Sequence, residues 1–546
     1  MSFLQLKVVL TVLFAASQMA GAASAGSDTS SSSAYLLQTP PTLSFDDLEK
    51  LASIDPIPAR LKEKLDGLLT KPFISNEAKG RGAVPKAPHV PELGPVLRIA
   101  EWNINRGENE SEVELALTDS SRFLAAARNN PSMMESDLRR AADELNELNG
   151  ADVVVLDEVD DGVKRTKYRN VARDLAKALN MNYVYGVEFI ELDRIYLGME
   201  KMDQADKFSH AAGEVFHLEP SRYLGLEGSA ILSRYPIHDA RIVRLPQRYD
   251  WYHQEIKAIS DVEKARRWTS EQLFEERITR QVRRGGRMAM VVDLEVPQSP
   301  TGLVTVVCPH LEDYTTPAGR LEQLDFLLGE IQDISNPVVL TGDFNTTGRS
   351  ARPITVRREI LKYLKDYRFW IRQVLFLVAP VPGLGYVFHA VNYFKNYHDP
   401  SAFNVPILLG NRSKKLFDHV ENFQFKDGGT FDFAGNKKAS YRRHGKTLAS
   451  SNQRAWKGFT PTFAFKRTFK GLVGRYKIDW FFIKRPEAKQ SSREDENASF
   501  TPHLGRTLQL VNDGLEPRIS DHCPITVTLP LGTADRPLRK DSATQP

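Results

Sequence analysis

Cysteine is almost absent from this chain of 546 residues, which contains only Cys308 and Cys523. Two cysteines can form neither a disulfide framework nor a cysteine-built zinc site. Each lies within two residues of a histidine, His310 or His522. We expect both to be small buried apolar residues, and a single bridge in an oxidising compartment is the alternative.

An excess of charge of one sign is also missing. The chain has 73 Lys and Arg against 69 Asp and Glu, which gives a formal net charge of +4. This is too small over such a length to indicate nucleic acid binding by itself. A content of 26% charged and 41% hydrophobic residues is typical of a soluble globular protein. The sequence also lacks internal repeats of the period typical of solenoids.

Long apolar runs are few, and the first belongs to the N-terminus. Lys7 precedes the apolar run Val8–Ala16, and Ala23-Ser24-Ala25 fits the pattern of small residues at which a signal peptide is cleaved. This pattern predicts a signal peptide over residues 1–25 and therefore a secreted or periplasmic protein. A retained membrane anchor is the alternative, but the apolar core is short for a span.

Residues 26–95 are predicted to be a linker and an N-terminal helical extension. Gly26–Ala34 has the composition of a flexible linker. The segment Leu43–Leu69 reads as helical, with Ser44 as its cap. Lys71–Pro95 carries five prolines and little periodicity, so we expect the main domain boundary there.

From Val96 onwards the pattern becomes an alternation of strands and helices. The expected strands are Val96–Asn103, Ala151–Glu158, Tyr183–Val187, Gly228–Ser233, Arg287–Val296, Gly302–Cys308, Val338–Thr341, Lys477–Ile483 and Ile525–Leu529. The expected helices are Met134–Leu148, Val171–Leu179 and Pro317–Ile331. Such an alternation predicts an α/β domain whose sheets are covered on both faces.

One stretch, Val338–Asn345, combines a buried strand with polar residues at its end. Asp343 and Asn345 are two positions apart, so on an extended segment they would point the same way. The carboxylate could orient or deprotonate a water, and the amide could donate to a developing anion. An Asx turn without function is the alternative.

Other predicted strands also end in polar residues. A histidine beside an acid, as in Asp521-His522, can act as a base if a further carboxylate fixes its tautomer, and Asp479 could do so. Glu158 offers oxygen to a hard cation such as Mg²⁺. Taken singly, these residues are as well explained by turns and solvated loops.

Taken in order, the motifs resemble those of the endonuclease/exonuclease/phosphatase superfamily. They are Trp102-Asn103, Asp157-Glu158-Val159, Gly228–Ser233, Pro309-His310-Leu311, Gly342–Asn345, Ile478-Asp479-Trp480 and Ser520-Asp521-His522. The resemblance runs from about Val96 to Leu529. It implies a four-layered α/β sandwich around two mixed β-sheets, with long inserts, and divalent-metal-dependent cleavage of phosphoester bonds.

The resemblance also implies a metal site for Mg²⁺ or Mn²⁺. Glu158 would be the main ligand, Asn103 would lie beside the metal and the scissile phosphate, and Asp521 would lie near a metal or phosphate. The superfamily usually has Gln before the metal-binding Glu, whereas this chain has Asp157. Asp157 could bring a second cation or face away, and we expect the latter because neighbours on a strand point to opposite faces.

Five residues would carry the chemistry by the same resemblance. Asp343 would orient or activate the attacking water, and Asn345 would hold a phosphate oxygen. His522 would be the general base, steered by Asp479. His310 would contact the phosphate or assist the leaving group, as in branches that cleave diesters.

We therefore expect a secreted or periplasmic phosphodiesterase acting on nucleic acid or a phospholipid head group, without an evident obligate protein partner. A phosphomonoesterase and a non-catalytic binding protein of the same fold are the alternatives. The basic, aromatic-containing stretches Tyr441–Lys446 and Lys457–Lys470 could grip a phosphate backbone or be solvated loops.

The insert at about residues 348–457 is longer than the superfamily fold requires. Pro380, Pro382, Gly383 and Gly385 interrupt its apolar middle, so a continuous membrane span is not expected. Either Arg358–Val378 is a helix buried on the sandwich, or Val378–Phe394 is an exposed apolar flap that makes peripheral membrane contact or closes over substrate. Residues 531–546 are expected to be a disordered tail.

Overall fold

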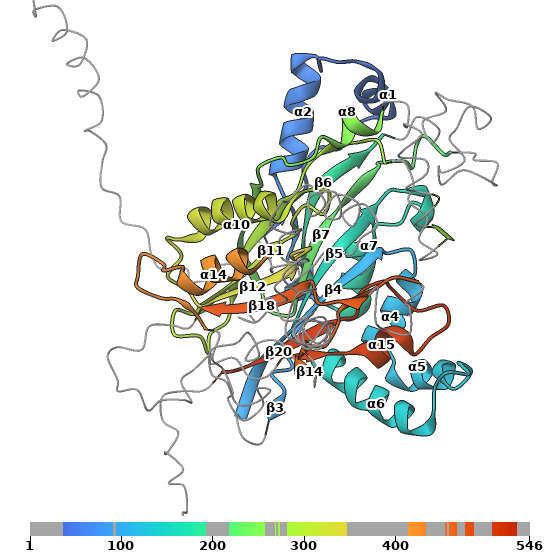
Figure 1. The fold of residues 1–546 in the computed structure, drawn as a ribbon, viewed down its shortest axis with the longest axis vertical. Helices are drawn as coiled ribbons and strands as arrows, with labels where there is room; N and C mark the ends of the chain where they lie inside the picture. Colours follow the sequence, from blue (N-terminus) through green and yellow to red (C-terminus); the bar gives the residue numbers. More distant parts are fainter. Residues whose placement is uncertain are drawn as a thin grey trace, which may run out of the picture. The chain divides into compact units, whose positions relative to one another are not determined.

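A computed structural model of the protein contains two large β-sheets (Figure 1). It describes residues 36–90, 94–192, 218–256, 268, 271–272, 281–346, 413–432, 454–455, 458–466, 475–484 and 505–531. Residues from Tyr35 onwards belong to one compact unit.

The larger sheet has ten strands and is mixed. Along the sheet the order is β1 (Leu37–Gln38), β2 (Phe73–Ser75), β6 (Asn182–Glu191), β7 (Leu226–Ser233), β5 (Val153–Asp161), β4 (Gly94–Arg106), β20 (Ile525–Pro530) and β19 (Arg506–Thr507), while β3 (His89–Val90) pairs with β4 and β9 (Arg283–Gly285) with β6. Only the β4–β5 pair is parallel among these described pairs.

The second sheet has six strands and is also mixed. Its order is β13 (Phe431–Asp432), β18 (Asp479–Lys484), β12 (Val338–Asp343), β11 (Leu303–Pro309), β10 (Met288–Glu295) and β8 (Ile237–Arg244). Strands β11 and β12 run parallel. Two further short pairs are β14 (Arg454–Ala455) with β15 (Gly458–Phe459), and β16 (Phe463–Ala464) with β17 (Arg475–Tyr476).

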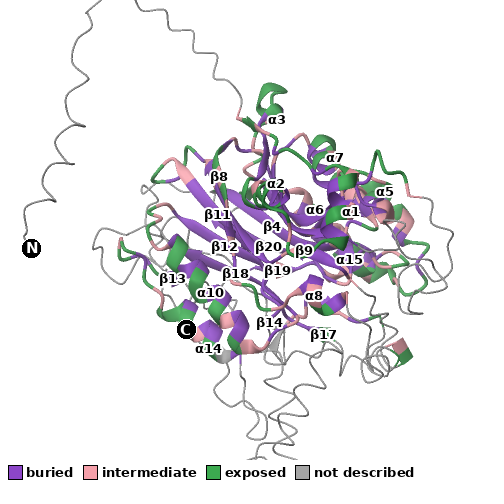
Figure 2. Ribbon diagram, turned by 90° about the horizontal axis from the view of Figure 1, so that it is seen from above, coloured by how far each residue is buried: buried purple, intermediate pink, exposed green. Residues whose placement is uncertain are grey.

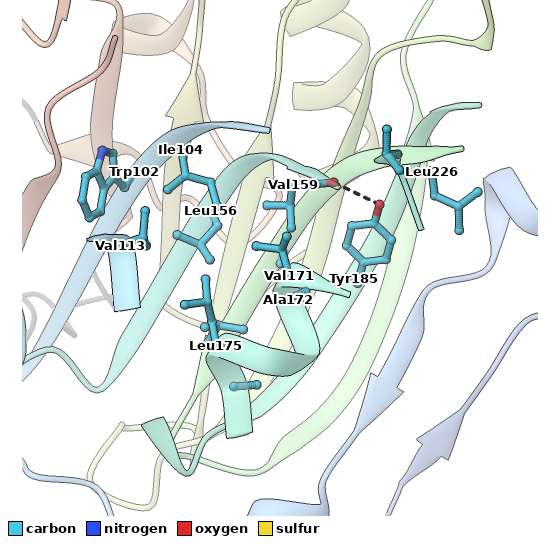
Figure 3. Packing of buried hydrophobic residues seen from close by; sticks show 14 of the residues in the cluster. Trp102, Ile104, Val113, Leu156, Val159, Val171, Ala172, Leu175, Tyr185 and Leu226 are labelled. Atoms are coloured by element: carbon cyan, nitrogen blue, oxygen red, sulfur yellow. Dashed lines mark hydrogen bonds between the residues drawn. The ribbon is translucent and has the colours of Figure 1, made fainter. Parts of the chain in front are cut away.

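Alternation along the strands builds three apolar cores. On β5, Val153 and Val155 lie in the core between the sheets, whereas Val154 and Leu156 lie in the core on the outer face. Figure 3 shows that outer core, where the hydroxyl of Tyr185 also donates to the carbonyl of Val159 at 3.1 Å.

Helices cover the outer face of each sheet (Figures 1 and 2). The helices whose side chains enter the core of the ten-stranded sheet are α1 (Phe45–Ser53), α2 (Ala59–Thr70), α4 (Glu110–Thr118), α5 (Ser120–Ala127), α6 (Glu135–Asn149), α7 (Val171–Leu179), α8 (Trp251–Glu255) and α15 (Gln509–Asp513). On the six-stranded sheet they are α10 (Pro317–Ile331) and α14 (Lys414–Asn422). Two short elements, α3 (Glu77–Gly80) and the 3₁₀ turn Lys164–Thr166, complete the described helices. The expected four-layered α/β sandwich around two mixed sheets is confirmed.

The predicted helices agree closely with the described ones. Val171–Leu179 and Pro317–Ile331 are confirmed at both ends, and Met134–Leu148 is shifted by one residue in α6. Leu43–Leu69 is two helices, because Pro56 and Pro58 interrupt it. Ser44 caps the first of them: its Oγ accepts from the Asp47 amide, and its own amide donates to the Asp47 carboxylate, both at 3.2 Å.

The N-terminal extension is part of the sandwich. Strand β2 pairs with β6, with Phe73 opposite Tyr185. The side-chain amide of Asn76 donates to the carbonyl of Ile237 at 2.7 Å and accepts from the Ile237 amide at 2.9 Å, so the extension also holds β8 of the other sheet. Since residues from Tyr35 onwards form one compact unit, Lys71–Pro95 does not separate two such units.

Several expectations lie outside the described residues. They are the leader over residues 1–25, the linker Gly26–Ala34, the two alternatives for the insert (Arg358–Val378 and Val378–Phe394), the basic stretch Tyr441–Lys446, most of Lys457–Lys470, and the tail from residue 532. None of the helices in the described part of the chain is long and apolar enough to cross a membrane.

Candidate active site

The predicted site residues converge where strands of both sheets end. Asn103, three residues before the end of β4, joins motifs from distant parts of the chain. Its Nδ2 donates to Glu158 Oε1 at 3.2 Å and to Asp343 Oδ2 at 3.3 Å. The tryptophan before it, Trp102, donates through its indole N–H to the carbonyl of His522 at 3.0 Å, which ties the last motif to the first.

A bulge on β5 turns Glu158 into the site. The register of β5 against β7 shifts between Leu156 and Val159, and Glu158 adopts a left-handed φ of 53°. This conformation is strained for a residue other than glycine, and such strain often accompanies a functional role.

The expectation that Asp157 faces away from the site is wrong. Its Oδ2 accepts from the backbone amide of Asp343 at 2.9 Å, and its Oδ1 accepts from Ser229 Oγ at 2.7 Å and Cys308 Sγ at 3.3 Å. The bulge at Glu158 breaks the alternation on which that expectation depended. Asp157 therefore supports the strand that carries Asp343. Cys308 and Cys523 are both free and buried.

His522 and Asp479 form a buried pair. The Nδ1 atom of His522 lies 3.0 Å from Asp479 Oδ2, and its Nε2 lies 3.8 Å from Asp343 Oδ2. Burial opposes the charged ring, but the carboxylates of Asp479, Asp521 and Asp343 raise the pKa of His522 to about 10. The Phe463 ring packs edge-on against the imidazole, with centroids 5.0 Å apart.

His310 belongs to a second buried pair that the sequence analysis missed. Its Nδ1 lies 3.1 Å from Glu188 Oε1 on β6, and its Nε2 lies 3.7 Å from Asp343 Oδ2. Arg287 donates to Glu188 Oε2 at 2.9 Å and to Asp313 Oδ1 at 3.0 Å.

The charges around His310 act on its ring in opposite directions, since Nη1 of Arg287 lies 2.8 Å from Nδ1 and Oε1 of Glu188 lies 3.1 Å from the same atom. Burial and the Arg287 guanidinium oppose the charged ring, but the carboxylates of Glu188 and Asp157 raise the pKa of His310 to about 9. Burial would raise the pKa of Glu188, but the charges of His310 and Arg287 lower it to about 2. A carboxylate in the middle of an otherwise buried strand was the available signal for Glu188.

Asn345 is held by hydrogen bonds to Asp343 and Leu311. Its amide N–H donates to Asp343 Oδ1 at 2.7 Å, and its side-chain Nδ2 donates to the carbonyl of Leu311 at 2.9 Å. Because a carboxamide nitrogen carries two hydrogens, the second is left for a substrate oxygen.

Glu101, two residues before Asn103 on β4, is a second residue that the sequence analysis missed. It is fully buried, and neither carboxyl oxygen has a hydrogen-bond partner among the described residues. Burial, with the negative charges of Asp479, Asp157 and Asp343, raises its pKa well above the usual range. Burial therefore favours the protonated form of Glu101 beneath the site.

Three groups of side chains bring ligand atoms within 4.8 Å of one another: Glu158 with His310 and Asp343, Asp343 with Asp479 and His522, and Asp157 with Glu188 and His310. The first group fits a hard divalent cation, because it combines two carboxylates and includes the strained, half-buried Glu158. The third does not, since the oxygens of Asp157 already accept three hydrogen bonds. Asp521 belongs to none of the three groups within the described chain.

Beyond Glu158 lies a cluster of arginines and carboxylates. Arg165 donates to both oxygens of Asp160, at 2.7 and 2.8 Å, and to Glu191 at 2.8 Å. Glu227 on β7 accepts from Arg283 at 2.8 Å. Arg106, the last residue of β4, comes only within 3.6 Å of Glu227.

Comparison with known proteins agrees with the motif order. The sequence model of the Endonuclease/Exonuclease/phosphatase family matches residues 100–522. No curated protein is similar enough in sequence to match.

Solved structures give weaker likenesses. An endonuclease/exonuclease/phosphatase from Beutenbergia cavernae DSM 12333 is 15% identical, with a TM-score of 0.33 over 80% of this chain and 72% of that chain. An AP endonuclease from Archaeoglobus fulgidus is 11% identical, with a TM-score of 0.35 over 79% of this chain and 99% of that chain. The 3′ phosphatase NExo from Neisseria, bound to a product DNA hairpin, is 13% identical, with a TM-score of 0.32 over 79% of this chain and 98% of that chain. At TM-scores this low, no argument rests on these likenesses.

Proposed function

This chain belongs to the endonuclease/exonuclease/phosphatase family, and we propose that it is a divalent-metal-dependent phosphodiesterase acting on nucleic acid or a phospholipid head group. One observation carries the proposal. The Nε2 atoms of His310 and His522 lie 3.7 and 3.8 Å from the same oxygen, Oδ2 of Asp343. Two imidazoles, each backed by its own carboxylate, therefore face the centre of one site.

Such a pair suits a diester. Hydrolysis needs a base for the attacking water and a donor for the phosphate or the leaving alkoxide. His522 is placed for the first task, because Asp479 holds its Nδ1 and leaves Nε2 beside Asp343. His310 would perform the second, because Glu188 lies beside its Nδ1 and raises its pKa.

Glu158 would hold Mg²⁺ or Mn²⁺, with Asn103 and Asp521 beside it. When bound, the cation would stabilise charge on the phosphate and offset the negative charge that raises the pKa of His522. Asp343 would orient the attacking water, His522 would accept its proton at Nε2, and the free amide hydrogen of Asn345 would donate to a phosphate oxygen.

Two alternatives to this proposal make different predictions. A phosphomonoesterase would not need His310, and a binding protein of this fold would need neither histidine pair.

The apolar leader supports a further proposal, that the protein is secreted or periplasmic. Peripheral membrane contact through the insert at 348–457 belongs to the phospholipid alternative.

The test is a parallel assay of the mature protein with Mg²⁺ or Mn²⁺ on DNA, RNA, sphingomyelin and a phosphomonoester. We expect hydrolysis of a diester and little of the monoester. Glu158→Gln should lose activity and serves as the control for contaminating enzymes. Faster hydrolysis of the monoester would favour a phosphatase, and absence of hydrolysis from all four would refute the proposal.

A further inference from the structure

Arg106 lies at a strained turn next to the candidate site. It ends β4, three positions after Asn103. Asn105, Arg106 and Gly107 have left-handed φ angles of 48°, 65° and 73°. Two consecutive residues other than glycine in this region are costly, and the surrounding structure must enforce them.

Local contacts do enforce this turn. The amide of Asn105 donates to Asn103 Oδ1 at 3.0 Å, and the amide of Gly107 donates to the carbonyl of Ile104 at 3.0 Å. A Cβ on Gly107 would come within 2.9 Å of Val171, so the chain packs tightly there.

Within the described part of the chain, the guanidinium of Arg106 lacks a full set of partners. Its Nε is buried without a hydrogen bond, and its one ion pair with a described residue is the 3.6 Å approach to Glu227. Arg283 donates to that carboxylate at 2.8 Å, and Arg165 lies 3.8 Å from it. Since a guanidinium has five donors and an under-paired cation costs free energy when buried, this arrangement favours an anion beside Arg106.

The strand order gives the position of that anion. Along the sheet the order is β7, β5, β4 and β20, and these carry Glu227, Glu158, Asn103 and, just before β20, His522. The side chain of Arg106 reaches from β4 across β5 to Glu227. It therefore lies on the opposite side of Glu158 from His522, while the charge of Glu158 still acts on it.

We propose that Arg106 binds a second, non-scissile phosphate group of the substrate. This inference rests on the proposed function, because it takes the scissile phosphate to lie between Glu158 and His522. It specifies a substrate with two phosphates near one another, as in a polynucleotide or a phosphorylated head group. Guanidinium is suited to this role, since it can donate two parallel hydrogen bonds to a phosphate.

Binding tests the inference without turnover. The probes are thymidine 5′-phosphate and thymidine 3′,5′-bisphosphate, titrated calorimetrically into the protein with Mg²⁺. We expect the wild-type protein to bind the bisphosphate at least about tenfold more tightly than the monophosphate. This is the ratio of dissociation constants that one charge-assisted hydrogen bond produces. Arg106→Gln should remove most of this difference, and Arg106→Lys should keep part of it.

Arg140→Gln is the matched control. Its side chain is 67% exposed on α6, and among the described residues it pairs only with Asp137, one turn before it. It should keep the full preference for the bisphosphate. Thermal denaturation checks that each variant is folded, and Arg106→Lys serves if Arg106→Gln is not.

Equal affinity of the wild-type protein for the two probes, or failure to bind the bisphosphate, overturns the inference. So does a preference that survives in Arg106→Gln, or an equal loss of affinity for both probes, which would place Arg106 on the first phosphate. The proposed function fails separately, in the hydrolysis assays above.

Discussion

The buried pair of His522 and Asp479 allows a quantitative test of the mechanism. The two side chains are almost fully buried, and Nδ1 lies 3.0 Å from the carboxylate. Asp479→Asn removes the charge but keeps the shape, so the ring loses its charged acceptor, and the new amide N–H can donate to Nδ1 and favour the wrong tautomer. A hydrogen bond to a charged group contributes about 1.5–3 kcal/mol. Losing it should reduce turnover roughly 10- to 150-fold.

His522→Ala should cost on the order of a hundredfold or more, as loss of a general base does. The double variant should be little worse than His522→Ala alone, because residues that act as a unit are not additive. Initial rates on bis(p-nitrophenyl) phosphate with Mg²⁺ or Mn²⁺ measure this cycle. Thermal denaturation must accompany it, since both residues are buried.

Multiplicative losses would contradict the reasoning. If the double variant lost the product of the two single effects, Asp479 and His522 would act independently. The same conclusion would follow if Asp479→Asn kept full activity in a protein of unchanged stability.

Three more predictions can be checked directly. Activity should disappear after exhaustive chelation and return with Mg²⁺ or Mn²⁺, and full activity of the metal-free protein would contradict the role of Glu158. Gly228→Ala should lower the free energy of unfolding by at least about 1–3 kcal/mol in denaturant unfolding, because its Cβ would come within 1.9 Å of the Gly186 carbonyl oxygen. The control is Gly329→Ala on α10, where a Cβ would meet open space. That change should be neutral or stabilising by up to about 1 kcal/mol. Hydrogen bonds to Asp55 and Asp250 raise the pKa of His253 above its ordinary value, so the charged imidazole stabilises the fold. This stabilisation is present in full below about pH 6.5 and is lost as the pH rises through the raised pKa. The loss of melting temperature in His253→Gln should therefore be larger at pH 5.5 than at pH 9, and an equal loss at both would contradict this.

Local patterns in the sequence predicted most of the framework. Val171–Leu179 and Pro317–Ile331 were predicted at both ends, because caps and apolar spacing act within a few residues. The order of the motifs predicted that Asn103, Glu158 and Asp343 share one site, although 240 positions separate the first from the last.

Contacts that depend on pairing between strands were not predictable. Glu188 became a partner of His310 only because β6 and the end of β11 approach each other, and its spacing in sequence carries no such information. Asp157 was misplaced because the bulge turns Glu158 into the site as well, whereas Asp157 simply continues the inner face of Val153 and Val155. Lys71–Pro95 was expected to hold the main domain boundary because of its five prolines, yet β2 and β3 lie within it.

The attachment of the N-terminal extension affects how the protein should be produced. A shortened protein beginning at Val96 would contain every motif of the family, and truncation there is the natural choice from sequence alone. It would remove β2 and Asn76, and so leave the backbone N–H and C=O groups that Tyr183–Tyr185 of β6 direct at β2 without partners. It would also uncover apolar surface that Leu48 and Leu68 now cover. Unpaired strand edges beside exposed apolar surface promote intermolecular pairing, so such a protein should aggregate during expression, and an inactive shortened protein would say nothing about the catalytic residues.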